Sequence, residues 1–393
     1  MANDVFVVKD HFKVWFNTPA PNTLIWSVGL WDSGALWDTS PTSNAWRNLN
    51  CEAYDVHIEH GVEIQSGIFV QPGGSTAIIK MQGPDYDPFS SGVIHAGTLV
   101  KIEIQPLPDS SPGTLTQIFF GQVESFTSTY DQKGNNIITI RAVDYMVKWL
   151  NAKIATYNIP GTTLPSSILD GTWIDNANGI TYLNTVADFA NIAATTYTNT
   201  TLGQITQDCL TASLGALYMD RAGYVHYLSD GDMAGLISSY TYYFSTAHST
   251  AAEHICMTGL QMQADSRDFP NVITETYAGG AELTLKNQDA YDVYGSIALD
   301  VTVPMGNSTD AQAWLDHLNL STNQRRVKSL SFDAAKREGQ LWGWYSADRL
   351  FTSHKVGYAI NGISFADNYF VTKQIDHITP HGWDITLELW RGI

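Results

Sequence analysis

The sequence has few cysteines, and their number and spacing exclude two classes of protein. Cys51, Cys209 and Cys256 are the three cysteines in 393 residues. Three thiols cannot all pair within one chain, and the wide spacing fits neither a disulfide framework nor a zinc cluster. We therefore expect buried, reduced thiols in a protein that folds in a cytoplasm.

Basic residues are also scarce, with 21 Lys+Arg against 39 Asp+Glu and a formal net charge of -18. A protein that binds nucleic acid needs a positive field to displace counterions from phosphates. The densest basic pair, Arg325–Arg326, is interpreted as solvated surface. The sequence therefore predicts no stable binding of nucleic acid, while an acidic surface would let nucleic acid pass without adhering.

A secretory leader and a long apolar run are both missing. The first residues, Met-Ala-Asn-Asp-Val, have neither the charged start nor the apolar stretch of a signal peptide. No window approaches the roughly 18 apolar residues that a membrane-spanning helix needs. We expect synthesis in the cytoplasm and no insertion of this chain into a membrane.

Local signatures of catalysis are absent as well. The sequence contains no Gly-x-Ser-x-Gly elbow, phosphate loop, dinucleotide fingerprint or papain-like context. Glycoside hydrolysis needs two facing carboxylates, which a sequence cannot exclude. Twelve tryptophans could line a sugar groove, but Trp149, Trp314 and Trp390 fall on apolar faces, where core packing is expected. We therefore predict no enzyme, no catalytic residue and no cofactor.

Two short patterns have the letters of a metal site. His57 and His60 are spaced like a metal pair, but their neighbours alternate as a strand, which points the two side chains to opposite faces. Asp85 and Asp87 could suit calcium, yet the twelfth position of an EF-hand loop counted from Asp85 is Ala96. A turn built on aspartate side chains explains them more simply. No metal is predicted, and ion binding at Asp85 and Asp87 stays open.

The composition instead favours β-sheets. Hydrophobic residues make up 44% of the chain, glycine, tyrosine and tryptophan are plentiful, and Val, Ile and Thr recur in short runs. Branched and aromatic side chains pack well on a pleated surface. Alternation and glycine punctuation predict strands in the first third at 52–64, 67–81, 99–104, 118–130 and 136–143. The segment 131–135, with a glycine for the turn, predicts a hairpin between the last two strands.

The middle of the chain predicts a small α/β unit. Asp144 can cap a short helix, and a loop rich in Pro, Gly, Ser and Asn is expected from 159 to 179. A hairpin is expected around the glycine turn at 220–223. Capping boxes and apolar spacing predict helices at 145–150, 185–195 and 201–213.

The last third predicts strands again, with one helical interruption. A capping box at Thr309 precedes an apolar helix face made by Ala311, Trp314, Leu315 and Leu318. Strands are expected at 271–277, 282–285, 297–303, 329–332, 349–351, 369–378 and 383–390. We therefore divide the chain into 1–150, a middle domain 151–262, and 263–393 with a helical insert around 286–345.

Short motifs stand at the joints between these elements. They are Asp85-Tyr-Asp87-Pro88, Gly97-Thr-Leu-Val100, Phe119-Phe-Gly121-Gln-Val123, Asp131-Gln-Lys-Gly134, Ala142-Val-Asp144, Leu169-Asp170, Leu217-Tyr-Met-Asp220-Arg-Ala-Gly223, Phe269-Pro-Asn271-Val-Ile273, Tyr294-Gly-Ser296 and a closing hairpin at 375–389. In this order and spacing they resemble the tail hub family of tailed bacteriophages, also called tail-associated or baseplate hub proteins. The resemblance spans nearly the whole chain.

The resemblance implies a mainly β, α+β fold in which two tail-tube-like β-barrel modules flank a small α/β domain. It also implies a virion protein of the tail tip, a homotrimeric ring that closes the tail tube and provides the channel for DNA ejection. The implied partners are the distal tail protein ring, the tape-measure protein and tail fibre or spike proteins. Larger hubs continue into peptidase, lysozyme or fibre domains, and none is expected in this sequence, so cell-wall cleavage is not expected.

Three alternatives remain open at this stage. The distal tail protein forms a six-fold ring with a related β-barrel, and two barrels around an α/β unit favour the hub over it. A carbohydrate-active or carbohydrate-binding β-protein is a second alternative, and a host-binding adhesin with an exposed aromatic groove is a third. The sequence does not reveal the phage, its host or its tail type.

Overall fold

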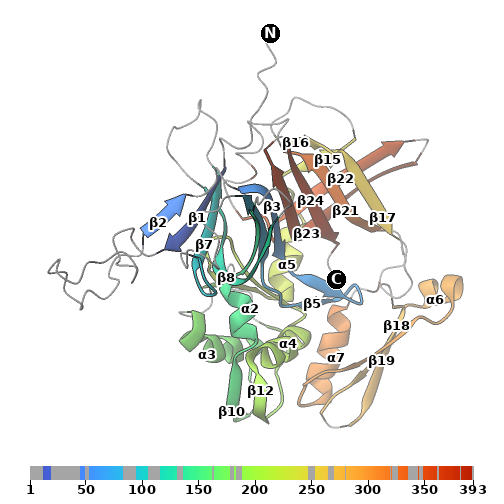
Figure 1. Ribbon diagram of the computed structural model, residues 1–393. Helices are drawn as coiled ribbons and strands as arrows, with labels where there is room; N and C mark the ends of the chain where they lie inside the picture. The colour runs from blue at the N-terminus through green and yellow to red at the C-terminus, as the bar shows by residue number, and fades with distance from the viewer. Residues whose placement is uncertain are drawn as a thin grey trace. The chain divides into compact units, whose positions relative to one another are not determined.

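The computed structural model describes residues 12–18, 45–48, 53–82, 94–104, 116–130, 136–161, 163–177, 181–182, 188–246, 253–263, 270–278, 280–318, 320, 326–334, 344, 348–360, 363–380 and 382–391. The chain divides into two compact units. The first consists of Met1–Ile58, Thr76–Asp144 and His377–Trp383, and the second of Glu59–Ser75, Tyr145–Asp376 and Asp384–Ile393. The protein is mainly β, as predicted, and all described helices belong to the second unit (Figure 1).

The first unit is built on one sheet. Its strands are β1 (Phe12–Thr18), β2 (Ala45–Asn48), β3 (Ala53–Gly61), β6 (Thr76–Gln82), β7 (Leu99–Ile104), β8 (Thr116–Tyr130) and β9 (Asn136–Val143). They lie in the order β3-β6-β9-β8-β7-β1-β2. The pairs from β6 to β2 are antiparallel. The predicted hairpin is confirmed in its two strands, β8 and β9, while its turn 131–135 lies outside the described residues.

Alternation of apolar side chains explains why these segments are strands. Ile79 and Met81 of β6 and Ile138 and Ile140 of β9 are fully buried, while the residues between them are more exposed. Each such side chain contributes about 1.5–3 kcal/mol through burial. Gly121 of β8 lies so close to the Val143 carbonyl that a Cβ atom would clash with it.

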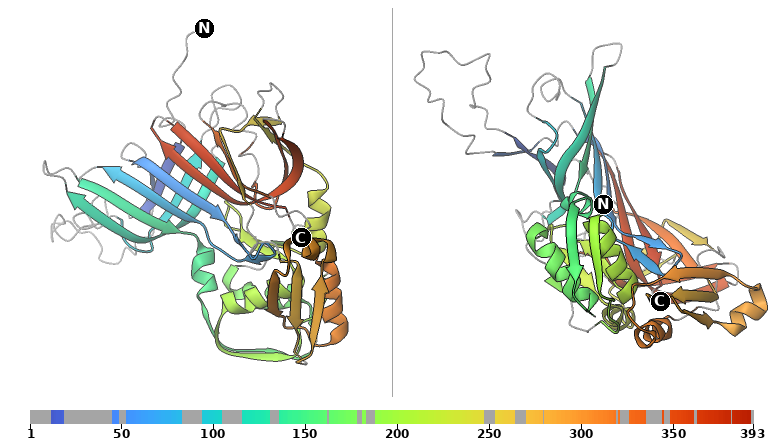
Figure 2. Two further views of the ribbon diagram at one scale, coloured as in Figure 1. Left: turned by 90° about the vertical axis from the view of Figure 1, so that its right-hand side faces the viewer. Right: turned by 90° about the horizontal axis from the view of Figure 1, so that it is seen from below.

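Another series of paired strands lies largely in the second unit. It contains β15 (Tyr243–Ser245), β16 (His254–Cys256), β17 (Gly259–Gln263), β21 (Arg326–Asp333), β22 (Ser353–Ile360), β23 (Ile363–Thr379) and β24 (Gly382–Trp390). The order is β16-β15-β22-β23-β24-β21-β17. Figure 2 shows that these strands, drawn in yellow to red, curve strongly. Within the described residues the end strands β16 and β17 do not pair with each other, so this series of strands is open.

The middle of the chain is a mixed α/β region, as predicted. It contains α2 (Tyr145–Leu150), β10 (Lys153–Ile159), α3 (Pro165–Ala177), β11 (Thr181–Tyr182), β12 (Thr195–Thr201), α4 (Leu202–Ser213), β13 (Ala216–Met219), β14 (Val225–Leu228) and α5 (Asp230–Ile237). The predicted helix at 201–213 is confirmed as α4. Its N-cap, Thr201, accepts a hydrogen bond from the backbone amide of Gln204 at 3.2 Å.

Two predictions for this region were wrong. The helix predicted at 185–195 is wrong: residues 188–194 are irregular, and Thr195 begins β12, whose threonine-rich segment pairs with β10. The expected loop at 159–179 contains α3. Its first turn is stabilised by Asp188, which accepts a hydrogen bond from the backbone amide of Ser166 at 2.8 Å. Asp188, which the sequence places in the capping box of the predicted helix at 185–195, therefore stabilises the start of α3 instead.

The remaining elements form a three-stranded sheet, two helices and a short hairpin. They are β4 (Glu63–Gln65), β5 (Phe69–Gln71), β18 (Val272–Thr276), β19 (Glu282–Lys286), β20 (Ala298–Thr302), α6 (Gln288–Tyr294) and α7 (Ser308–His317). The central strand β18 pairs antiparallel with β19 and parallel with β20. The strand predicted at 349–351 is wrong, because this segment turns, with Phe351 at a φ of 53°.

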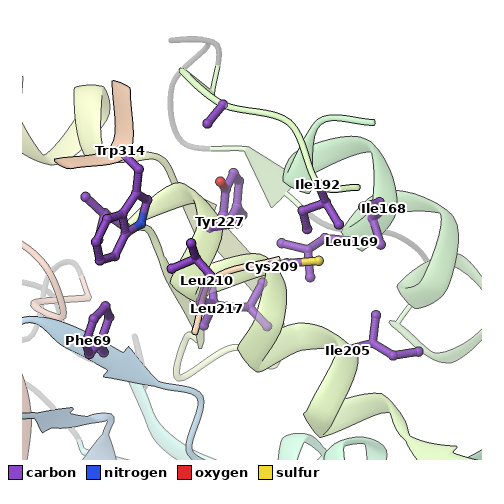
Figure 3. Packing of buried hydrophobic residues seen from close by; sticks show 14 of the residues in the cluster. Phe69, Ile168, Leu169, Ile192, Ile205, Cys209, Leu210, Leu217, Tyr227 and Trp314 are labelled. Carbon is purple, nitrogen blue, oxygen red and sulfur yellow. The ribbon is translucent and has the colours of Figure 1, made fainter. Parts of the chain in front are cut away.

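A hydrophobic cluster around α4 joins these parts of the second unit (Figure 3). Trp314 of α7 is fully buried, its ring stacks on Phe69 with 6.1 Å between centroids, and its indole N–H donates to the Thr211 carbonyl at 2.7 Å. Cys209 and Leu210 of α4 lie in the same cluster. None of the described helices has the length and apolar character needed to span a lipid bilayer.

Candidate functional site

The two histidines of the His-x-x-His pattern point to opposite faces of β3, as its alternation predicted. His57 is half-buried, and its ring centroid lies 6.2 Å from that of His377. His60 is buried and contacts Ser75 and Asp348 instead. The two rings therefore do not converge on one ion. Among the residues that the structure describes, no group of three His, Cys, Asp or Glu side chains is arranged to hold a metal.

His60 belongs to a polar cluster centred on Asp348. The His60 Nδ1 atom lies 2.6 Å from Ser75 Oγ, and its Nε2 atom lies 3.2 Å from Asp348 Oδ2. Asp348 also accepts hydrogen bonds from the backbone amides of Arg221 at 3.0 Å and Leu350 at 2.9 Å. Burial alone would raise the pKa of Asp348, but the charges of His60 and Arg221 and these hydrogen bonds hold it well below its usual value.

Ser75, His60 and Asp348 are the residue types of a hydrolytic triad. Ser75 is 5% exposed, which leaves a substrate almost no access to its hydroxyl. The cluster instead ties together segments that are as much as 288 residues apart in the sequence. We therefore assign it a structural role. Sequence reasoning missed it because each partner comes from a different part of the chain.

A second polar cluster surrounds Trp344. The Arg349 Nε atom donates to the Trp344 carbonyl at 2.7 Å, and the guanidinium carbon lies 5.1 Å from the centroid of the Tyr242 ring. The Trp344 indole N–H donates to Gln374 at 3.0 Å. Burial first, and then the charge of Arg349, lower the pKa of His354 to about 3, so this buried ring is neutral. These side chains are engaged with each other and form a polar core.

Glu275 of β18 is a buried carboxylate without hydrogen-bond partners among the described residues. It is 0% exposed. Alternation places it on the same face as Ile273, and its neighbours across the sheet are Leu283 and Val301. Burial raises the pKa of Glu275 to about 7. No sequence motif marked this residue.

Other residues that the sequence analysis singled out are placed as follows. Cys209 is buried, which raises the pKa of its thiol, and Cys256 is half-buried. Trp314 and Trp390 are buried in apolar packing, as predicted, and Trp149 is partly buried. The side chains of Cys51, Asp85, Asp87, Arg325 and Arg326 lie outside the described residues.

Several strands have one paired side only, counting the residues that the structure describes. β17 pairs with β21 alone, and β19 and β20 each pair with β18 alone. β10 and β12 pair only with each other. Unpaired backbone groups at such edges are templates for pairing with another chain. These edges are therefore candidate assembly surfaces.

No protein-family model matches the sequence, and no curated protein matches it. Solved structures do match. The tail protein from Neisseria meningitidis MC58 is 12% identical, and the similarity covers 96% of each chain with a TM-score of 0.61. The 43 kDa tail protein of prophage MuSo2 from Shewanella oneidensis is 11% identical, with a TM-score of 0.57 over 89% of this chain and 96% of that one.

A third structure extends the same likeness. The prophage tail protein gp18 from Listeria monocytogenes EGD-e is 10% identical, with a TM-score of 0.52 over 88% of this chain and 91% of that one. At such low identity the likeness is one of fold. It extends over nearly the full length of all three proteins.

Proposed function

From the fold that this chain shares with phage tail proteins, we propose that it is a non-enzymatic structural protein of a phage tail. The observation that carries the proposal is the similarity to the tail protein from Neisseria meningitidis MC58 over 96% of both chains. The likeness therefore covers residues of both compact units. The motif order in the sequence supports the same assignment.

Within the tail, the proposed position is the hub of the tip. Residues 1–150 and 263–393, with a helical insert around 286–345, form two tail-tube-like β-barrel modules in this proposal, and 151–262 form the α/β domain between them. Three copies then place six similar modules around a ring that closes the tail tube. The presence of several long paired strands in each compact unit supports a pair of β modules. Edge strands would be paired between neighbouring subunits of the ring.

The proposed partners follow from that position. They are the distal tail protein ring, the tape-measure protein and the tail fibre or spike proteins, with DNA passing through the channel during ejection. A net charge of -18 supports such a channel, since a negative wall repels phosphates. We expect acidic side chains to outnumber basic ones on the inner wall, and a structure of the ring with a basic or neutral wall contradicts this part.

Native mass spectrometry and electron microscopy of the purified protein test the hub. Three copies of 43.3 kDa give about 130 kDa, and we expect an annulus of that mass with three-fold symmetry and a central hole. A six-fold ring of about 260 kDa would instead identify a distal tail protein. A strict monomer at high concentration, together with absence of the chain from tail particles, contradicts both assignments.

A further inference from the structure

Two adjacent apolar side chains are exposed at the end of α6. Val293 is 71% exposed and Tyr294 is 46% exposed. The other exposed large apolar residues of the described chain are not sequence neighbours of each other: Ile78, Tyr130, Tyr224, Tyr240 and Met262. Single exposed apolar residues are common on protein surfaces, whereas a pair on one short element is a candidate contact point. Figure 1 shows α6 at one end of the sheet formed by β18, β19 and β20.

Both ends of α6 are held firmly in place. At its start, Asn287 accepts a hydrogen bond from the Ala290 amide at 3.0 Å, and its side-chain amide donates to the Leu320 carbonyl at 2.6 Å. At its end, Gly295 takes a φ of +74° and its amide donates to the Tyr291 carbonyl at 2.8 Å. The positive φ favours glycine at this position. The short helix is therefore fixed although it lies at the surface.

Asn271, at the start of β18, adds a third anchor. Its side-chain amide donates to the Gly295 carbonyl at 2.7 Å, and its side-chain oxygen accepts from the Ile297 amide at 2.8 Å. Asn271 is buried, and the hydrogen bonds span 24 and 26 residues. This contact joins two of the sequence motifs, the one around Asn271 and the Tyr294-Gly-Ser296 turn. A buried polar side chain thus fixes the position of the exposed pair.

The charge around the exposed pair is predominantly negative. The exposed acidic residues of α6 itself are Asp289 and Asp292. One basic residue, Lys286, lies at the end of β19 just before α6. Its ammonium lies 3.3 Å from the centroid of the Tyr291 ring. We call Asp289, Asp292, Val293 and Tyr294 the α6 tip. A rigid apolar contact bordered by carboxylates fits a partner with an apolar pocket bordered by Lys or Arg.

We propose that the α6 tip is a docking surface for a different protein of the tail, one that presents an apolar pocket bordered by basic residues. A second α6 tip is a poor occupant, because both tips carry the carboxylates of Asp289 and Asp292 and like charges repel. The rigidity of the tip favours binding, since little conformational freedom is lost when it docks. The inference rests on the proposed role in a tail, which supplies the partner.

Photo-cross-linking in assembled tail particles tests the inference. Tyr294→p-benzoylphenylalanine places a reactive ring at the tip, and Tyr224→p-benzoylphenylalanine, at a tyrosine that is 63% exposed, is the matched control. We expect position 294 to cross-link to another tail protein at a segment that contains Lys or Arg, and position 224 not to reach that segment. Adding Asp289→Lys and Asp292→Lys should lower the yield at position 294 roughly tenfold, because the charge complementarity is lost.

The outcomes separate this inference from the proposed function. Cross-links from position 294 to another copy of this chain alone, or to no protein although the variant is present in tails, overturn the docking surface and leave the tail assignment intact. A yield that does not change in the lysine variant overturns the charge argument and the proposed partner chemistry with it. Absence of the chain from tail particles overturns the proposed function, and the docking surface falls with it.

Discussion

Glu275 is a single residue whose burial sets a pH dependence for the folded chain. Its carboxyl group is fully buried between apolar neighbours, and its pKa is raised from 4.5 to about 7. A raised pKa means that the folded state accommodates the protonated, neutral carboxyl group better than the charged carboxylate. Its contribution to stability is therefore present below about pH 4.5 and is lost as the pH rises through about 7.

The variant Glu275→Gln should remove this pH dependence. The amide stays neutral, so the variant should be more stable than the parent at pH 8, by up to roughly 3 kcal/mol, with the difference falling to about 1 kcal/mol at pH 5. The measurement is the midpoint of thermal unfolding for both proteins between pH 5 and 8. The matched control is Glu282→Gln on the exposed side of β19, for which the two profiles should coincide. Parallel profiles for parent and Glu275→Gln would contradict the prediction.

Asp348 provides the opposite case, a carboxylate whose side chain is 20% exposed and which its buried partners keep charged. Asp348→Asn leaves the guanidinium of Arg221 without its counter-charge and weakens the contact with His60, so we expect a loss of about 3–5 kcal/mol in the free energy of unfolding at pH 7. In the parent, this contribution is present above the usual aspartate pKa and is lost as the pH falls below it, because folding lowers the pKa of Asp348.

The free energies of unfolding of Asp348→Asn and of a control variant are measured by chemical denaturation. Asp55→Asn is the control, since Asp55 pairs at 2.7 Å with Lys80, whose side chain is 43% exposed. Screening by water should limit that loss to about 1 kcal/mol or less. Equal losses in the two variants would show that the Asp348 cluster does not tie its segments together.

At the scale of elements, the pairing of β8 with β9 depends on a close approach at Gly121. A Cβ atom there would meet the Val143 carbonyl and the Phe119 ring. Gly121→Ala should therefore destabilise the first unit by about 1–3 kcal/mol. Gly235→Ala in α5 is the control, since no atom lies within 4 Å of the added carbon, and alanine should stabilise the helix by up to about 1 kcal/mol. Thermal unfolding of both variants tests this prediction. A Gly121→Ala variant as stable as the parent would contradict the steric argument.

Element types were predictable where one local pattern dominated. The alternation of β9 and the cap and apolar face of α4 were sufficient for correct predictions. The segment 185–195 failed because a capping pattern competed with the β-branched run that follows it. Pairing with β10 decided the outcome, and Asp188 stabilised α3 instead of its own segment. Local patterns do not state which distant partner a segment will have.

At the scale of the whole molecule, the acidic charge predicts how the protein behaves toward DNA. With a net charge of -18, the purified protein should not retard duplex DNA in a gel at physiological salt, since it cannot replace the counterions of the phosphates. Lowering the salt should not induce binding either, because electrostatic repulsion then grows. A retarded band that weakens as salt is added would contradict this prediction and reveal a basic surface.

The sequence by itself determined the predominance of strands, the mixed α/β middle region and the acidic charge, because composition and short-range periodicity encode them. It also carried the motif order that resembles tail hubs, and the fold agrees with tail proteins. The tertiary structure alone decided that His60 meets Asp348, that Glu275 is buried without a described partner, and that Asn271 holds the end of α6. Each of these depends on contacts between residues distant in the chain, which no local pattern specifies.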